Sequence, residues 1–520
     1  MRRRILLLAA VCLLGGACAS PTTGATKDHA TILLGAPTSL DPAATGDAGS
    51  AAFTAQFFES LTTFDTSLEL RPALAESWRI EQGGRRIVFH LRPDLRFSDG
   101  SPLRATDVVR SWLRVIDPAR PSPLATLLLD VEGATEYVSG RGTVDAVGLH
   151  ADDAADDVIV DLVRPAAEFP TIVASPTFGV VPPGVGHDPA ALQAGDGFVV
   201  SGGYRLTATE ASTMTLSANP HYWAGPPALA TIDIVNDLGG RSQVEAFERG
   251  ELDYAPIAEF DASWIAYDAT LGPQLRTVPS LSTDYYGFDA SRPPFDDVRV
   301  RQAFAGAVDW RRIATLALTD PAGVATSMVP PGIPDRSDTD VLPAHDPDGA
   351  RALLAEAGFP GGAGFPDVTL VTGGSPYDAA VIAEIRRELG ITLHAETMDF
   401  DAYFTRLDED PPAMWFLSWV ADYPGRNDFL GVLLGSGASN NYGRWNSAEF
   451  DAAIAEAGAA PFEAAATAAY DRAEAIVGRD APVIPVSYGT GWALARDGLL
   501  GAGQNGLGAL RFAGLAWATP

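Results

Sequence analysis

A strand–helix–strand pattern between residues 368 and 395 is the feature that most constrains the fold. Residues 368–371 and 391–395 are short apolar runs typical of strands, and residues 379–389 between them have the spacing of a helix. A helical crossover allows two consecutive strands to lie parallel in one sheet, with a right-handed connection. Similar alternation begins at Ala30, so the chain is expected to have an α/β fold with mixed β-sheets flanked by helices.

Two other stretches predict elements with identifiable ends. Residues 86–92 alternate as a strand does, and a helix follows the Asp99-Gly100 turn with Thr106 as its expected N-cap. A second helix begins at Asp346, a good N-cap residue, and ends at Gly358, which suits the C-terminal cap.

Length and charge limit the classes of function. A chain of 520 residues is too long for one core, so two or three domains are expected. The net charge of -30 argues against binding to nucleic acid or to anionic lipid. Lys27 is the only lysine. A phosphate-binding loop that ends in Gly-Lys-Ser or Gly-Lys-Thr therefore cannot occur after residue 27.

The N-terminal segment has the features of a targeting signal. Three arginines precede a short apolar run at residues 5–14, small residues follow, and then comes Cys18. This resembles a bacterial lipoprotein signal, in which residues 1–17 are removed, Cys18 is lipidated and residues 18–29 form a tether. An ordinary secretory peptide with an incidental cysteine is the alternative. The only other cysteine, Cys12, lies in the removed part, so lipidation would account for the one remaining thiol.

A search for catalytic or metal-binding motifs is negative. The seven histidines have no ligand spacing, and no hydrolase or metalloprotease motif occurs. Gly501, Gly503 and Gly506 match a dinucleotide-binding spacing, but no βαβ context surrounds them, so a surface loop is expected. We therefore predict no enzyme activity, no catalytic residues, no cofactor and no metal, while a secreted hydrolase with an acid pair stays a less favoured alternative.

Several sequence blocks, in order, resemble the large extracytoplasmic solute-binding proteins of bacterial ABC importers. That family includes the oligopeptide-, dipeptide- and nickel-binding proteins. The blocks are RPALAESWRI (71–80), IVFHLRPDLRFSDGSPLRATDVVRSW (87–112), LSANPHYWAG (216–225), FERGELDYA (247–255) and PPFDDVRVRQAFAGAVD (293–309).

The resemblance implies a periplasmic-binding-protein-like two-lobe fold of the class with an extra third domain. Domain I would consist of residues 30–55, 174–272 and 490–520. Domain II would be an insertion at residues 56–173, and domain III would cover residues 273–489. The ligand cleft would lie between domains I and III, which close by a hinge motion.

The stretch LSWVADY, residues 417–423, carries the main site prediction. The resemblance implies that Asp422 binds the free α-amino group of a peptide, with Trp419 three residues earlier as an apolar wall and Ser418 beside it. A charge-assisted hydrogen bond to an ammonium contributes about 1.5–3 kcal/mol. The alternative is that Asp422 caps the following turn and Trp419 belongs to the core.

Position in the family fold suggests further ligand contacts. Thr45, Gly46 and Asp47 follow the first strand of domain I, and Tyr285 and Tyr286 lie near the crossing into domain III. The tyrosines could stack on a ligand, although tyrosine on a strand is more often packed in a core.

The predicted function is that of a lipid-anchored, extracytoplasmic binding protein that delivers oligopeptides or similar amine-bearing solutes to an ABC permease. A monomer is expected. Some peptide-binding relatives carry an arginine shortly before the tryptophan, and here residues 414–418 contain none. A non-peptide ligand in the same fold, such as a metal chelate, an oligosaccharide or an opine-like compound, is therefore kept as the alternative.

Overall fold

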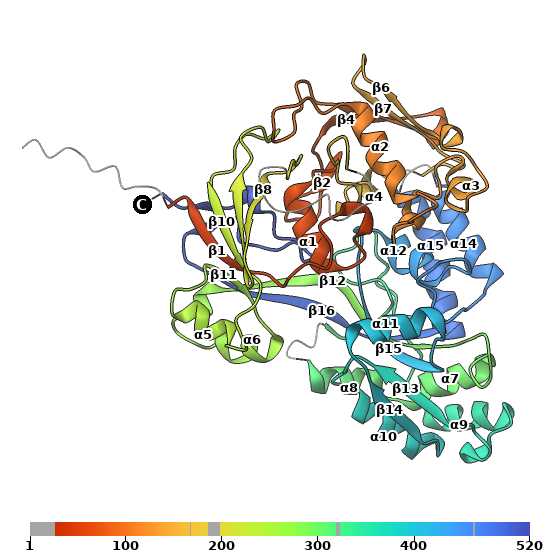
Figure 1. The fold of residues 1–520 in the computed structure, drawn as a ribbon. Helices are drawn as coiled ribbons and strands as arrows, with labels where there is room; N and C mark the ends of the chain where they lie inside the picture. Colours follow the sequence, from red (N-terminus) through yellow and green to blue (C-terminus); the bar gives the residue numbers. More distant parts are fainter. Residues whose placement is uncertain (1–26, 167, 186–197, 319–322, 461–462, 520) are drawn as a thin grey trace, which may run out of the picture.

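A computed structural model describes residues 27–166, 168–185, 198–318, 323–460 and 463–519. In this part of the chain the strands form a ten-stranded sheet, a four-stranded sheet and two two-stranded ribbons. Figure 1 shows the four-stranded sheet at the top of the molecule and the two ends of the large sheet at the left and the lower right. The predicted signal peptide and Cys18 lie outside the described residues.

The ten-stranded sheet is mixed, as the sequence predicted. Strand β1 pairs in parallel with β10 and β11, and β13 pairs in parallel with β14 and β15, whereas the other neighbours are antiparallel. In order across the sheet the strands are β14 Leu393–Thr397, β13 Val368–Thr372, β15 Met414–Val420, β12 Leu275–Phe288, β16 Val483–Ala495, β11 Tyr254–Pro256, β1 His29–Leu33, β10 Thr231–Val235, β9 Thr213–Ala218 and β8 Tyr204–Thr209.

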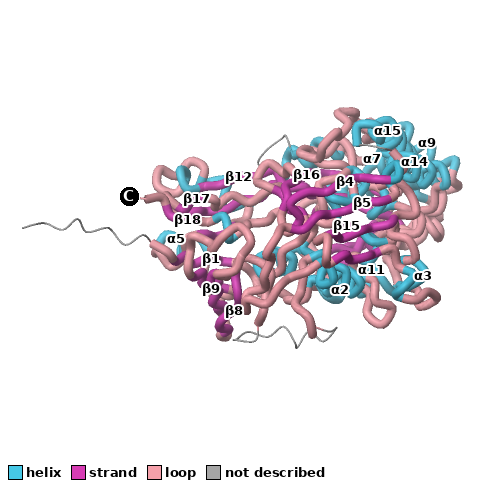
Figure 2. Tube along the Cα trace, turned by 90° about the horizontal axis from the view of Figure 1, so that it is seen from above, coloured by secondary structure: helices cyan, strands magenta, loops and turns pink. Residues whose placement is uncertain are grey.

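The two long central strands, β12 and β16, join the halves of this sheet. They pair antiparallel along most of their length, with register shifts between Pro279 and Thr283 and between Asp284 and Tyr285. Proline has no N–H to donate, which is consistent with an interruption of the ladder at Pro279. In Figure 2, β1, β8 and β9 lie at one end of the molecule and helices α7, α9, α14 and α15 at the other.

Helices cover both sheets. Those of the described chain are α1 Ala48–Phe57, α2 Ala105–Val115, α3 Ala134–Val138, α4 Phe169–Ile172, α5 Gln243–Glu248, α6 Glu259–Ile265, α7 Val298–Ala307, α8 Trp310–Ala317, α9 Pro347–Glu356, α10 Asp378–Leu389, α11 Phe400–Glu409, α12 Arg426–Phe429, α13 Gly431–Leu434, α14 Ala448–Gly458 and α15 Glu463–Asp480. None of these helices is both long and apolar enough to span a bilayer.

The predicted strand–helix–strand unit is confirmed. It consists of β13, α10 and β14, and β13 and β14 pair in parallel. The predicted helix at Asp346 is also confirmed: α9 begins with Pro347, and the Asp346 carboxylate accepts the N–H of Gly349. Gly358 follows its C-cap with a φ of 99°, a conformation that glycine adopts without strain.

The four-stranded sheet is built from β4 Ala75–Glu81, β5 Arg86–Leu91, β7 Asp157–Asp161 and β6 Leu149–Asp152, in that order. Strand β5 is the one predicted at residues 86–92. We call this sheet, helices α2–α4 and their shared core the small-sheet region. Helix α2 packs on the sheet through Val108 and Trp112, which are completely buried.

The predicted cap of α2 is wrong. The N-cap is Arg104, two residues earlier than predicted, and the Asp107 carboxylate accepts the main-chain N–H of Arg104. Thr106 instead donates its hydroxyl to Asp153, which lies on the β6–β7 hairpin. The main-chain N–H of Thr106 donates to the same Asp153 carboxylate, so an acid from the hairpin accepts one of the free N–H groups of the first turn.

Two small ribbons and a loop complete the chain. The ribbons pair β2 Thr62–Phe64 with β3 Leu70–Pro72, and β17 Leu499–Leu500 with β18 Ala516–Trp517. Residues 501–506 form a loop, as expected for the glycine-rich stretch. The predicted domain boundaries stay a prediction, and the one at residue 490 falls inside β16.

Candidate ligand-binding site

Strand β15 delivers the predicted site residues to one end of the large sheet. Trp419 lies opposite Thr283 of β12, and its ring packs against the core beneath α12–α15. The strand ends at Val420, and residues 421–425 turn into the short helix α12. Asp422 therefore lies in the turn that follows the strand, where the sequence predicted it.

Asp428, at the end of this turn and in α12, organises the site. Its side chain has no exposed surface. Its Oδ2 accepts the indole N–H of Trp419 over 3.0 Å and the main-chain N–H of Asp422 over 3.1 Å. One buried carboxylate therefore links both residues that carried the main site prediction.

Each acid of this pair has a buried oxygen that finds no hydrogen-bond partner among the residues that the structure describes. These atoms are Oδ2 of Asp422 and Oδ1 of Asp428. Burial raises the pKa of Asp422 to about 7. Burial and the nearby Asp422 carboxylate raise the pKa of Asp428 well above its usual range. Buried charged oxygens without partners are costly, so the pair favours a proton or a cation.

The small-sheet region meets the large sheet at this turn. Tyr423 is completely buried and belongs to the core of the small-sheet region, while its hydroxyl accepts from Asn427 over 3.1 Å. Glu168, which precedes α4, adds a negative charge that raises the pKa of Asp428 and of Tyr423. The candidate site thus lies at a junction between two parts of the fold.

Arg426, the first residue of α12, makes hydrogen bonds to groups outside the acid pair. Its Nη2 donates to Asp471 over 2.7 Å and also to Glu474, and its Nη1 donates to the carbonyl of Asp335 over 3.0 Å. The Arg426 and Glu474 side chains are 2% and 1% exposed. This ion pair anchors α12 to α15 and leaves the charges of Asp422 and Asp428 for another partner.

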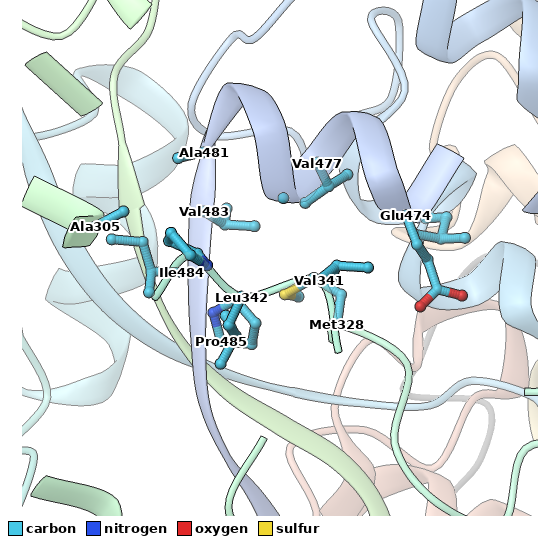
Figure 3. A pocket seen from close by; sticks show the side chains of 13 residues that line it. Ala305, Met328, Val341, Leu342, Glu474, Val477, Ala481, Val483, Ile484 and Pro485 are labelled. Atoms are coloured by element: carbon cyan, nitrogen blue, oxygen red, sulfur yellow. The ribbon is translucent and has the colours of Figure 1, made fainter. Parts of the chain in front are cut away.

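A cavity is lined at one end by Glu474, the acid of that ion pair (Figure 3). Its lining is apolar, with Met328, Val477 and Ile484 among its residues, except for the Glu474 carboxylate at one end. Because Glu474 already accepts from Arg426, we assign the cavity to packing beneath α15 rather than to the candidate site.

The other residues predicted from β12 and β15 lie apart from the acid pair. Ser418 is exposed, lies opposite Asp284 and hydrogen-bonds to its carboxylate. Alternation along the strand places Ser418 on the sheet face opposite Trp419. Tyr285 is buried in the same core as Trp419, and Tyr286 is buried on the other face, where its hydroxyl donates to Asp378 over 2.6 Å.

The three residues predicted near the first strand are engaged locally. Asp47 is the N-cap of α1 and accepts from the Ser50 N–H over 2.8 Å, and the Thr45 hydroxyl donates to the Asp41 carbonyl over 3.0 Å. Gly46 lies against Pro123, so that a Cβ at this position would approach its ring to 2.9 Å. Their role toward a ligand stays a prediction.

Sequence reasoning did not identify Asp428. Asp428 follows the polar residues Arg426 and Asn427 and is apolar only on its C-terminal side, so it shows half of the signal that drew attention to Asp422. The chain returns through α12 and so brings Asp428 beside Asp422. The local sequence around Asp428 does not predict this return. No group of three or more His, Cys, Asp or Glu side chains suited to a metal ion occurs in the residues that the structure describes.

Comparison with known proteins places this site in a family. The model for "Bacterial extracellular solute-binding proteins, family 5 Middle" matches residues 69–441. Among curated proteins, the "Probable deoxycholate-binding periplasmic protein YgiS" of Escherichia coli (strain K12) is 31% identical over 476 residues, which are 87% of this chain and 86% of that protein. The "Oligopeptide-binding protein OppA" of Bacillus subtilis (strain 168) is 24% identical over 92% of this chain and 90% of its own length.

Solved structures share the fold. The murein tripeptide binding protein MppA of Escherichia coli superposes with a TM-score of 0.84 at 24% identity, covering 95% of this chain and 99% of that one. Haemophilus influenzae OppA in complex with RPPGFSPFR gives 0.80 at 23% identity, over 94% of this chain and 99% of that one. The predicted two-lobe α/β fold is thereby confirmed, and the chain belongs to the family 5 extracellular solute-binding proteins of bacteria.

Proposed function

We propose that this protein is the lipid-anchored binding component of an ABC transporter and captures oligopeptides or similar amine-bearing solutes for a membrane permease. The observation that carries the proposal is the acid pair, in which Asp422 and Asp428 each have one buried oxygen that no described residue hydrogen-bonds. An ammonium is a suitable partner because its N–H groups satisfy these oxygens and its charge offsets the cost of burying them.

The path of the chain supports a ligand position between two lobes. Strands β12 and β16 cross between the halves of the large sheet, and the acid pair lies in the half that contains β15. In the proposed arrangement, domain III carries the acid pair and closes on domain I by bending at these two strands. Closure would exclude water and strengthen the contact between ammonium and carboxylate.

A second candidate ligand is an amphipathic anion, favoured by the relative that is named as a probable deoxycholate-binding protein. A carboxylate in that ligand would meet two buried acids and the nearby charge of Glu168. Like charges in a buried site repel strongly, so we rank this candidate below an amine.

Native mass spectrometry tests the proposal. The protein, purified without refolding, is incubated with an equimolar library of Ala-X-Ala tripeptides, with the same library acetylated at the N-terminus, and with deoxycholate. Retention of free tripeptides and not of acetylated ones supports the proposal, whereas retention of deoxycholate alone would replace it. Cleavage of the peptides during incubation would favour the hydrolase alternative.

A further inference from the structure

The candidate site contains two acids although a ligand with one ammonium needs only one. Asp428 is more deeply placed than Asp422, since it has no exposed surface while Asp422 is partly exposed. A purely structural acceptor for the Trp419 indole would not need a charge, because an asparagine or glutamine oxygen accepts the same hydrogen bond. The second carboxylate therefore calls for an explanation of its own.

The hydrogen bonds divide the oxygens of Asp428 into two kinds. Oδ2 is occupied by two donors, the Trp419 indole and the Asp422 amide, so it holds the side chain in place. Oδ1 is buried and has no hydrogen-bond partner in the described part of the chain, and the same is true of Oδ2 of Asp422. The pair thus presents two acceptor atoms, one from each acid.

The charged groups around the pair do not neutralise it. Asp422 and Glu168, both acids, act on Asp428, and Glu168 approaches from the small-sheet region. Arg426 in the same turn donates to Asp471 and Glu474. Two further polar groups of the described residues lie at this turn, the Trp419 indole, which donates to Oδ2, and the buried hydroxyl of Tyr423.

Two buried carboxylates without a cation cannot both ionise at low cost, so such a pair holds a proton to a higher pH than an exposed carboxyl does. The raised pKa of each acid agrees with this expectation. A cation that enters the site stabilises the ionised form of both carboxylates, because it supplies positive charge and hydrogen-bond donors. The pair then loses the proton.

We infer that Asp422 and Asp428 act together as one receptor for a cationic group with at least two N–H donors, and that its arrival expels the proton which the empty pair shares. The inference rests on the proposed function and specifies its ligand class as primary ammonium or guanidinium groups. A primary ammonium has three donors and a guanidinium has five, so either can serve both oxygens. A trimethylated amine carries the same charge but no donor and would leave both oxygens without a partner.

Proton release on binding tests the inference. Protein and the free Ala-X-Ala library are mixed at pH 7 in weakly buffered solution with an indicator dye, and the protons released per bound peptide are counted. The wild-type protein is expected to release roughly half to one proton. Asp428→Asn keeps the shape of the side chain and an oxygen that can accept from Trp419. This variant is expected to release less than about a third as many protons as the wild type and to bind the peptides about tenfold more weakly.

The controls separate the possible outcomes. Glu409→Gln, an exposed acid on α11, is expected to release protons as the wild type does. If Asp428→Asn unfolds, Trp419→Phe removes only the indole hydrogen bond to Asp428 and is expected to change the proton count as well. A library trimethylated at the N-terminus is expected to bind at least about tenfold more weakly than the free library.

Binding of free peptides without proton release, or with release unchanged in Asp428→Asn, would overturn the inference and leave the proposed function standing. Equal binding of the trimethylated library would overturn the requirement for two donors. Absence of binding by every free peptide would overturn the proposed function, and the inference would fall with it.

Discussion

Trp419 and Asp428 are joined by a hydrogen bond of 3.0 Å between the indole Nε1 and the carboxylate Oδ2, although they belong to different elements, β15 and α12. The same oxygen accepts the main-chain N–H of Asp422. Asp428 thereby orients the tryptophan ring and the turn that carries Asp422, so changes at these three positions are expected to affect ligand binding together.

Replacing Asp422 with asparagine is expected to weaken binding of a free-amine peptide by roughly tenfold or more, the scale of one lost charge-assisted hydrogen bond. Isothermal titration calorimetry with a tripeptide retained in the mass-spectrometric assay measures the change. The matched control is Glu409→Gln, an exposed acid of α11, for which affinity should stay the same. Unchanged affinity in Asp422→Asn would remove this residue from the ligand site.

Trp419→Phe is expected to weaken peptide binding by about three- to tenfold while the protein stays folded. The variant keeps an aromatic ring but loses the N–H that the Asp428 carboxylate accepts. One intramolecular hydrogen bond contributes about 0.5–1.5 kcal/mol net, which is of the order of the expected loss in affinity. Titration calorimetry, with circular dichroism as the check on folding, measures the effect. A variant with full affinity would indicate that the indole contributes to packing alone.

The stability of the ligand-free protein should depend on the acid pair in a defined direction. A carboxyl whose pKa rises on folding from 3.8 to about 7, as that of Asp422 does, favours the folded state at low pH and loses this contribution as the pH rises through 7. Asp422→Asn is therefore expected to melt about 2 °C or more above the wild type at pH 8, with a smaller difference at pH 5. Differential scanning fluorimetry across this range gives the comparison.

Glu388→Gln is the control for that experiment, because folding lowers the pKa of Glu388 whereas it raises the pKa of Asp422. Arg387 and Arg351 lower the pKa of Glu388, so its carboxylate stabilises the folded state at neutral pH, and that contribution is lost on acidification. The glutamine variant should melt no higher than the wild type at pH 8. A rise in both variants would mean that loss of net negative charge, and not the buried pair, causes the effect.

Removing the Arg426 guanidinium is expected to destabilise the fold strongly. Arg426→Met leaves the buried Glu474 carboxylate without its ion-pair partner, a change that costs about 3–5 kcal/mol in other buried pairs. Arg472→Met is the matched control, because Arg472 pairs with Glu456 on the surface, where such pairs contribute about 0–1 kcal/mol. Urea unfolding measures both, and equal effects would show that Arg426 is not a structural anchor.

Cys18→Ala is expected to release the protein from the membrane, because the proposed lipid is attached to this thiol. Cell fractionation with immunoblotting detects the shift, and labelling with a palmitate analogue reports the lipid directly. Cys12→Ala is the control, since Cys12 lies in the segment that would be removed. If Cys18→Ala stays in the membrane fraction, the lipoprotein prediction is wrong.

Local signals predicted the regular elements well. The strand–helix–strand unit of β13, α10 and β14 and the helix that begins at Asp346 follow from apolar spacing and capping residues, which act over only a few residues. The N-cap of α2 differs from the prediction because Thr106 is engaged by Asp153 on a distant hairpin. Arg104, which is not a favoured N-cap residue, takes that position with its N–H donated to Asp107.

The order of the residues alone determined an α/β chain with an acid at the end of a buried strand, because hydrophobic periodicity and turn chemistry are local properties. Only the tertiary structure decided that Asp428 returns beside Asp422, that Arg426 turns away to Glu474, and that Tyr423 enters the core of another region. These relationships depend on contacts between elements, whose geometry is set by the packing of the whole chain and not by the spacing of neighbours in sequence.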